Sequence, residues 1–167
     1  MHLTELASQA IAQRGADAVV RIAPATLLAD PLVTAFIPNR IGPLLTPQLA
    51  ERHAADLLWT PRLVADSHPQ GWAIWAALAG VELSSAPERR FAHLHFAMDA
   101  ALAGLGMAVL PWPLVAEDVR AGRLVAPLGF RKSESAFAIL ASPGAESRAL
   151  SRFRDWLVAE GAKTPEP

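Results

Sequence analysis

Cysteine is absent from this sequence of 167 residues. Its absence excludes disulfide bonds, thiolate nucleophiles and zinc sites built on cysteine, and it is compatible with a cytoplasmic protein. The 15 basic and 16 acidic side chains leave a net charge of −1, so the chain offers no basic field for a phosphate backbone. No run reaches the roughly 18 apolar residues of a membrane span, and the first residues lack the apolar core of a signal peptide. We therefore expect a cytoplasmic chain that contacts no membrane and does not bind DNA by itself.

The short motifs that carry catalysis are also missing. The sequence contains no G-x-S-x-G elbow, no H-E-x-x-H and no G-x-x-x-x-G-K. Gly104-x-Gly106 ends an expected helix and leads into a strand, which is the reverse of the strand-to-helix order of a dinucleotide fingerprint. No recognisable motif places a third ligand beside His93-x-His95. We therefore expect no enzyme, no cofactor and no metal.

Hydrophobic residues make up 52% of the sequence and charged residues 19%, which is typical of a well-buried globular protein with one sizeable core or two small lobes. Thr46 is expected to cap a helix that begins with Pro47. Apolar periodicity predicts the other elements of the first hundred residues. The expected helices are one with the apolar face Leu3, Leu6, Ala10 and Ile11, one at 71–79 and one at about 95–103. The expected strands are at 16–22, 63–65 and 89–92, and an extended segment at 32–45 is expected to be interrupted at Pro38.

The segment AALAGLGMAVLP, residues 100–111, is the most informative part of the sequence. It ends an alanine-rich helix, turns at Gly104 and Gly106, which can take the left-handed conformations that stop a helix, and continues as a buried strand closed by Pro111. A short amphipathic helix, strands at 123–126 and within 135–143, and a final helix around 150–157 are expected to follow. A small helix face leading into a buried strand suits an α/β fold with a parallel sheet.

These segments, in this order, resemble the effector-binding domain of LysR-type transcriptional regulators, most of all its glycine-cleavage-activator branch. The resemblance extends over nearly the whole chain. It rests on GADAVVRI, RIGPLLTPQLAERH, WAIWAALAG, AALAGLGMAVLP, AGRLVAPL, AFAILASP and FRDWLVAEG. It implies an α/β, two-lobed fold of the periplasmic-binding-protein type II, in which the chain starts in one lobe, crosses to the second and returns.

The resemblance also implies where the lobes divide. Residues 1–37 and 125–167 are expected to form the first lobe, and residues 38–124 the second. Family members begin with a winged helix-turn-helix, and their first lobe opens with a strand, a helix and a second strand, none of which has a counterpart in this sequence. From mean element lengths, the first lobe is expected to lack roughly 30 residues.

The implied function is that of a ligand-sensing and oligomerisation module. A small organic effector, expected to be an anion, would bind between the lobes, the chain would form homo-oligomers, and DNA would be contacted only through a helix-turn-helix domain that this sequence does not contain. One alternative is a protein-interaction module that binds no ligand and forms mixed dimers with full-length regulators. Another alternative, a secreted solute-binding protein of the same fold, is disfavoured because no export signal is present.

The expected ligand contacts lie in the second lobe, where helix N-termini can hold a carboxylate or phosphate without a basic side chain. His93 and His95 should point to one side of an extended segment, although histidines on the surface or within a core are more common. Three candidates also have a structural role as the alternative to ligand binding. Thr46 would cap a helix, Trp72 would be a packing group, and His68 would be a solvated loop residue. The candidate set is Thr46, His68, Trp72, His93, His95 and Met98.

Overall fold

The computed structural model describes residues 15–145 and 147–167. The described residues divide into two compact units, which are residues 15–39 with 134–166, and Arg40–Ser133 with Pro167. We call them unit 1 and unit 2. The helix expected from Leu3 to Ile11 lies outside the described residues.

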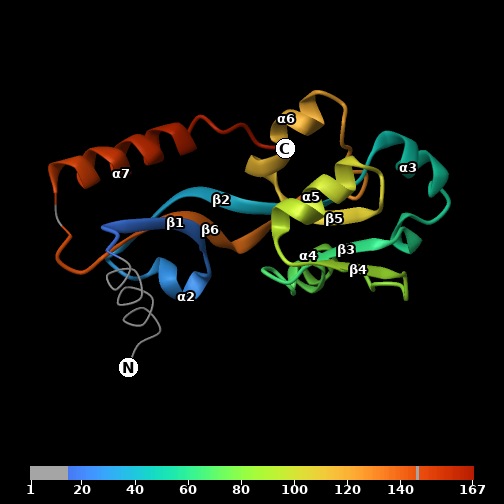
Figure 1. Cartoon of the computed structure of the whole chain (residues 1–167), viewed down its shortest axis with the longest axis horizontal. Coiled ribbons are helices and arrows are strands. Elements are labelled where there is room, and N and C mark those ends of the chain that lie inside the picture. The colour runs from blue at the N-terminus through green and yellow to red at the C-terminus, as the bar shows by residue number, and fades with distance from the viewer. Residues whose placement is uncertain (1–14, 146) are drawn as a thin grey trace. The chain divides into compact units, whose positions relative to one another are not determined.

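Unit 1 is built on a small sheet with the strand order β1-β6-β2. The strands are β1 (Ala18–Ala23), most of β6 (Arg131–Ala141) and the first part of β2 (Val33–Leu44). The short helix α2 (Ala25–Leu28) and the long helix α7 (Arg148–Gly161) lie on opposite faces of these strands (Figure 1).

The two faces of this sheet carry different side chains, because successive residues of a strand point to opposite faces. β1 runs antiparallel to β6, with Val19 opposite Leu140 and Val20 opposite Ile139. Leu140 packs with residues of α2 in a small buried cluster, whose other buried members are Ala23, Leu27 and Ala138. Ile139 and Val20 therefore belong to the face that α7 covers.

Unit 2 carries a sheet with the order β2-β5-β3-β4. The end of β2 runs antiparallel to β5, whereas β3 is parallel to both β4 and β5. Its elements after β2 are α3 (Pro47–Arg52), a 3₁₀ turn (Leu57–Trp59), β3 (Arg62–Ala65), α4 (Gly71–Ala79), β4 (Glu88–Phe91), α5 (Leu94–Leu102), β5 (Met107–Pro111) and α6 (Trp112–Arg120).

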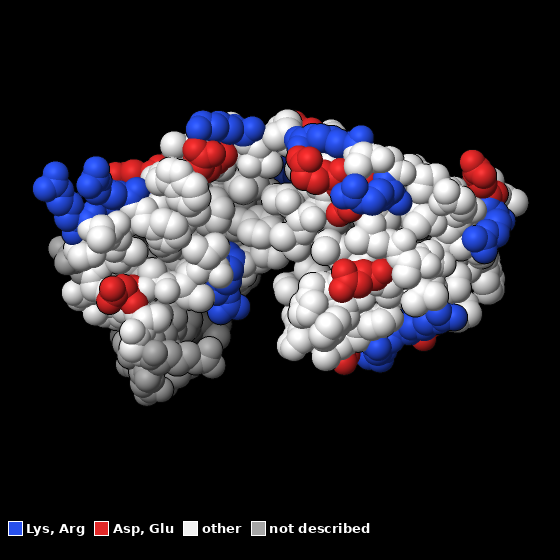
Figure 2. All heavy atoms as spheres, turned by 45° about the horizontal axis from the view of Figure 1, so that its top comes forward, with Lys and Arg blue, Asp and Glu red and all other residues white. Residues whose placement is uncertain are grey.

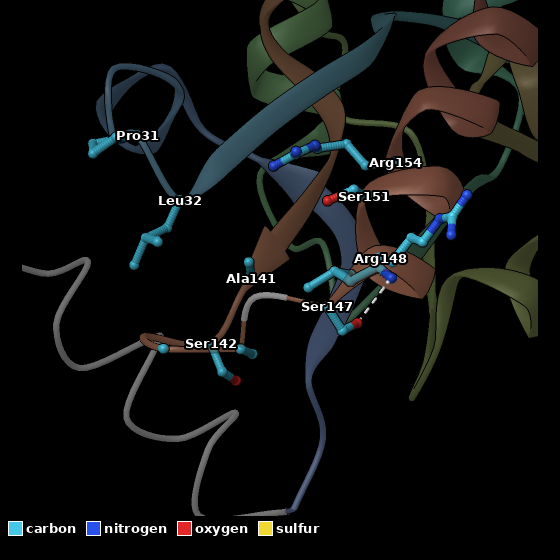
Figure 3. Close-up of a pocket in the computed structure, with 11 residues that line it drawn as sticks. Pro31, Leu32, Ala141, Ser142, Ser147, Arg148, Ser151 and Arg154 are labelled. Atoms are coloured by element: carbon cyan, nitrogen blue, oxygen red, sulfur yellow. Dashed lines mark hydrogen bonds between the residues drawn. The ribbon is translucent and has the colours of Figure 1, made fainter.

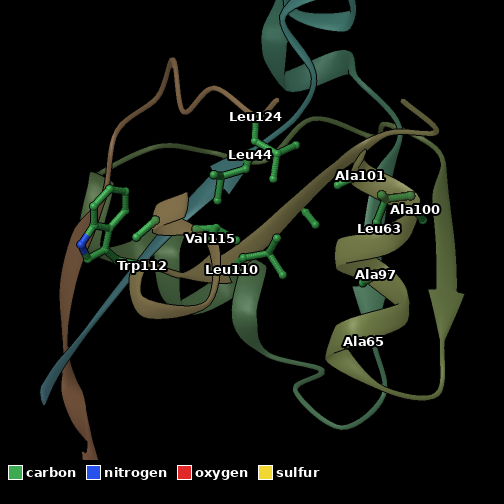
Figure 4. Close-up of a cluster of buried hydrophobic side chains, with 12 residues drawn as sticks. Leu44, Leu63, Ala65, Ala97, Ala100, Ala101, Leu110, Trp112, Val115 and Leu124 are labelled. Atoms are coloured by element: carbon green, nitrogen blue, oxygen red, sulfur yellow. The ribbon is translucent and has the colours of Figure 1, made fainter. Parts of the chain in front are cut away.

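Both faces of β3 and β5 are buried, as expected for parallel strands flanked by helices, whereas the edge strand β4 is mostly exposed. Leu63 and Leu110 point to the cluster formed with α5 and α6, to which Ala97, Ala100 and Val115 contribute (Figure 4). Val64 and Val109 point the other way, into a cluster that contains Trp72 and Trp75 of α4. The alternation along β3 and β5 explains why these strands read as continuous apolar runs.

The structure confirms most of the expected elements and corrects four local predictions. Gly71–Ala79 has the expected bounds, and Thr46 caps α3 by accepting a hydrogen bond from the Leu49 N–H at 3.4 Å. Pro38 does not interrupt β2, which runs unbroken through it because the fixed φ of proline is compatible with extended backbone.

The strand expected at 123–126 is wrong. Only Val125 forms a bridge there, exchanging backbone hydrogen bonds with Leu45 at 2.9 and 3.2 Å. Gly106 does not take the left-handed conformation expected for it, whereas Gly104 does, with a φ of 72°. The extended segment expected through His95 is also wrong, since α5 begins at Leu94.

Candidate functional site

The parallel strands β3 and β4 end at the same edge of the unit 2 sheet, and the loops that follow them meet there. The Asp66 N–H donates to the Phe91 carbonyl at 2.8 Å, and the Ser67 N–H donates to the Ala92 carbonyl at 3.2 Å. In sheets with parallel strands, ligands bind outside the carboxyl ends of the strands. We call this region, residues 66–70 with 92–96, the carboxyl edge.

The two histidines singled out from the sequence lie together at the carboxyl edge. His93 is the residue before the first turn of α5, and His95 is in that turn. Their rings stack with centroids 5.6 Å apart, and the Phe96 ring lies 4.0 Å from that of His95. All three side chains are exposed, and Phe96 keeps 46% of its surface accessible. The structure therefore presents two imidazoles and an aromatic ring on one exposed surface.

The start of α5 has hydrogen-bond donors to offer. His93 makes no side-chain cap, and the first turn contains no acidic residue. The N–H groups of Leu94 and His95 have no partner within the helix, because an α-helix leaves its first N–H groups unpaired. The unpaired donors and the positive end of the helix dipole favour a negatively charged group at this position.

His68 belongs to the same edge, together with Ser67 and Arg90, which are not among the six candidate residues. The His68 Nδ1 and Ser67 Oγ lie 3.2 Å apart. Asp66 accepts two hydrogen bonds from Arg90, from Nε at 3.0 Å and from Nη2 at 2.5 Å, both to Oδ1. Both partners are about half exposed, so this ion pair contributes little to stability but fixes where the loop after β3 lies.

Trp72 and Met98 pack in the two hydrophobic clusters on opposite faces of the unit 2 sheet. Trp72 is 6% exposed, and its Nε1 donates to the Leu63 carbonyl at 3.3 Å. The guanidinium of Arg62 lies over the Trp72 ring, 5.8 Å from its centroid. Met98 is partly buried against the cluster that contains Leu63. These contacts are packing contacts, and a ligand role for either residue stays a prediction.

The structure does not bring Thr46 to the histidines. β2 ends beside the first residues of β5, with Leu44 opposite Ala108. A Cβ on Gly104, just past the end of α5, would lie 3.6 Å from the Thr46 Oγ1. His93 and His95 are at the other end of α5, whose nine residues span about 13 Å. Thr46 as a ligand contact therefore stays a separate prediction, at the opposite edge of the sheet.

Unit 1 contains a hollow of its own, beside the first turns of α7 (Figure 3). None of the six candidate residues lines it. Its lining is Pro31, Leu32, Ala141, Ser142, Gly144, Ala145, Ser147, Arg148, Leu150, Ser151 and Arg154.

Clusters of charge and of metal-binding groups give no second candidate within the described residues. On the face shown in Figure 2, basic side chains stand in small groups among acidic ones. Residues 15–145 and 147–167 contain no group of three or more histidine, cysteine or acidic side chains that could hold a metal. In the same ranges no helix combines the length and apolarity that crossing a membrane requires.

Comparison with known proteins places the chain in a family. The model of the LysR substrate binding domain matches residues 1–162, and the chain belongs to this family. The chain is 37% identical over 150 residues to the HTH-type transcriptional regulator TrpI of Pseudomonas aeruginosa, an alignment that covers 86% of this chain and 51% of that protein. It spans about half the length of the curated relatives it matches, 51% and 46%.

Solved structures show the same fold. The effector domain of the transcriptional regulator AmpR of Pseudomonas aeruginosa matches with a TM-score of 0.74 and 23% identity, covering 91% of this chain and 75% of that one. The AmpR effector-binding domain from Citrobacter freundii matches with a TM-score of 0.74 and 25% identity, covering 92% of this chain and 78% of that one. The expected α/β fold of the periplasmic-binding-protein type II and the resemblance to LysR-type effector domains are confirmed. The matched relatives are transcriptional regulators.

Proposed function

We propose that this chain is the effector-sensing and oligomerisation module of a cytoplasmic LysR-type regulator, and that its effector is a small organic anion. The observation that carries the proposal is the match of the LysR substrate binding domain to residues 1–162. We assign contact with DNA to a helix-turn-helix domain, which the names of the curated relatives mention, because the near-neutral charge of this chain gives no basic surface for a DNA backbone.

The proposed contacts are those of the carboxyl edge. A carboxylate of the effector accepts hydrogen bonds from the N–H groups at the start of α5, since that helix lacks both a side-chain cap and an acidic first turn. His93 and His95 lie at this position, and we assign further contacts to His68 and to the Ser67 hydroxyl in the loop after β3. Trp72 and Met98, which pack on opposite faces of the sheet, are the remaining proposed contacts at this end of unit 2. That the effector binds between the two lobes, as the resemblance implies, stays a prediction.

The test is a calorimetric titration of the chain with amino acids and small mono- and dicarboxylates, each paired with its neutral amide. We expect at least one acid to bind and its amide to bind at least about tenfold more weakly, because a hydrogen bond to a charged group contributes about 1.5 kcal/mol or more. Equal affinity for the acid and its amide would rule out the role of the α5 N-terminus.

Variants distinguish a binding site at the carboxyl edge from one at the opposite edge of the sheet, where Thr46 lies. His95→Ala and Ser67→Ala should each weaken binding about tenfold while the thermal midpoint changes by no more than a few degrees, because both side chains are exposed. Thr46→Val is the matched control at the opposite edge, and weaker binding in this variant alone would move the site there. If no acid binds and the chain instead forms mixed dimers with a full-length regulator, the interaction module is the correct function.

A further inference from the structure

We propose that the hollow in unit 1 beside α7 binds a small oxyanion, whose charged oxygens accept hydrogen bonds from Arg154 and Ser151. The oxyanion is a carboxylate or a phosphate monoester that carries a short apolar body. This site shares no residue with the carboxyl edge, so it is independent of the proposed effector contacts. The size of the hollow, the direction of Arg154 and the absence of a counter-charge among the described residues carry the argument.

The hollow lies between the first turns of α7 and the ends of two strands, and it has the size of a small-molecule site. Its volume is about 480 Å³, within the roughly 300–1,000 Å³ of ligand pockets. The Ala141 N–H donates to the Leu32 carbonyl at 2.9 Å, which joins the strand ends that form one wall. Every described lining residue follows α2 in the sequence and belongs to unit 1. The walls are therefore built by one compact unit.

Arg154 faces the sheet, although charged residues are expected on the solvent side of such a helix. Gly161, at the end of α7, is buried, and a Cβ there would overlap the Phe36 carbonyl oxygen in β2. Arg154 lies seven residues earlier, which is within about 20° of two full helical turns. It therefore belongs to the stripe of α7 that faces β2, together with the partly buried Leu150 and Leu157. Figure 3 shows Arg154 extending from α7 toward β2.

The Arg154 guanidinium is partly buried, and no protein anion pairs with it in the described part of the chain. Within residues 15–145 and 147–167, neither Arg154 nor Ser151 forms a hydrogen bond or an ion pair through its side chain. The described lining contains no acidic side chain and one further arginine, Arg148. Partial burial of a charge is unfavourable unless the charge is paired and hydrogen-bonded. A bound oxyanion supplies that pairing.

The remaining lining determines the chemistry of the ligand. A guanidinium donates two parallel hydrogen bonds to a carboxylate or phosphate, and the Ser151 hydroxyl, which Figure 3 shows on the side of α7 toward the hollow, adds a third donor. The Ser147 hydroxyl accepts from the Leu150 N–H at 3.1 Å and keeps its own hydrogen to donate. Pro31 and Leu32 line the hollow with apolar surface. The charged group therefore binds at α7, and the apolar body lies against the residues before β2.

NMR titration of the isotope-labelled chain tests the site, with inorganic phosphate and butyrate as the probes. The Arg154 Nε–H resonance, identified by its loss in Arg154→Lys, reports directly on contact with the anion. We expect it to shift saturably with at least one probe, with a dissociation constant on the order of 1 mM, and not with chloride at the same ionic strength. Tighter binding of phosphate indicates a phosphate ester, and tighter binding of butyrate indicates a carboxylate. No saturable shift with either probe would overturn the proposal.

Two variants of α7 separate a binding role of Arg154 from a structural one. Arg154→Met should weaken binding of the tighter probe at least about tenfold, followed through the backbone N–H of Ser151, because the hydrogen bonds to the charged group are lost. Its thermal midpoint should stay within about 3 °C of the parent chain or rise, because no described partner loses a hydrogen bond.

Arg152→Met is the matched control. Arg152 is exposed, lies about 200° around α7 from Arg154 and does not line the hollow, so binding should not change. Unchanged binding in Arg154→Met, or an equal loss in both variants, would overturn the proposal. A lowered thermal midpoint with binding retained in Arg154→Met would show instead that this arginine has a structural role. The readout is in unit 1, so the result does not depend on effector binding at the carboxyl edge.

Discussion

Gly106→Ala is the most informative single change to the fold, because it adds one methyl group at the closest approach in unit 2. A Cβ at Gly106 would overlap the Pro61 carbonyl oxygen and would lie 2.8 Å from the Leu63 Cδ2. The Pro61 carbonyl also accepts the Met107 N–H at 2.8 Å, which joins the beginning of β5 to the residue before β3. The added methyl therefore pushes apart two strands that a hydrogen bond holds together.

The expected loss follows from these contacts. Overpacking of a well-packed interior costs about 1–3 kcal/mol, and weakening the Met107 N–H bond costs about 1 kcal/mol more. Replacing glycine by alanine also reduces the freedom of the unfolded chain, which returns about 0.4–1 kcal/mol. We expect the free energy of unfolding to fall by about 2–3 kcal/mol, because the overlap and the weakened hydrogen bond together outweigh that gain.

Urea denaturation followed by circular dichroism measures this loss, and Gly122→Ala is the matched control. Gly122 has a φ of 69°, and an added Cβ there would meet nothing within 4 Å, so alanine adds backbone strain without overlap. The cost of left-handed backbone for alanine is about 1 kcal/mol. A Gly106→Ala variant as stable as wild type, or less affected than Gly122→Ala, would show that the close approach to Pro61 does not constrain this position.

Three further predictions concern the helix cap, the buried arginine and nucleic acid. Thr46→Val should lower the free energy of unfolding by about 1 kcal/mol and Thr46→Ser should not, because serine keeps the hydroxyl that caps α3; equal losses in thermal or urea unfolding would argue against the cap. Arg62→Met should lower the free energy of unfolding by about 2 kcal/mol in the same assay. The Ser84 carbonyl, which accepts from the Arg62 Nη2 at 2.8 Å, would lose its donor, and the cation over the Trp72 ring would be removed. An unchanged urea midpoint would contradict this role. The chain by itself should give no sequence-specific mobility shift with DNA at physiological salt, and a saturable shift of one operator would refute the argument from its balanced charge.

Much of the local structure was predictable from the sequence because its signals act between neighbouring residues. The Thr46-Pro47 pair predicted the start of α3, and apolar periodicity predicted α4 with the bounds that it has. Gly104 at the end of an alanine-rich helix predicted the left-handed residue after α5. In each case the hydrogen bonds and backbone angles that define the feature involve residues at most five positions apart in the sequence.

The sequence did not predict what depends on strand pairing. The sequence indicates a strand at 123–126, but Val125 pairs only with Leu45 and the ladder does not continue. Position 106 is occupied by glycine because a side chain there would overlap the Pro61 backbone. Only the pairing of β3 with β5 brings that backbone close. The helix begins at Leu94, so His93 and His95 meet through a helical turn and not along an extended segment.

The composition of the candidate site divides in the same way. The sequence by itself determined the residue types available, their order and the family that this order defines, because these are properties of the chain before it folds. Only the tertiary structure decided that His68 and Ser67 join His93 and His95 at one edge while Thr46 lies at the other. The direction of parallel strands sets which loops share an edge, and that direction is fixed by hydrogen bonds between segments distant in the sequence.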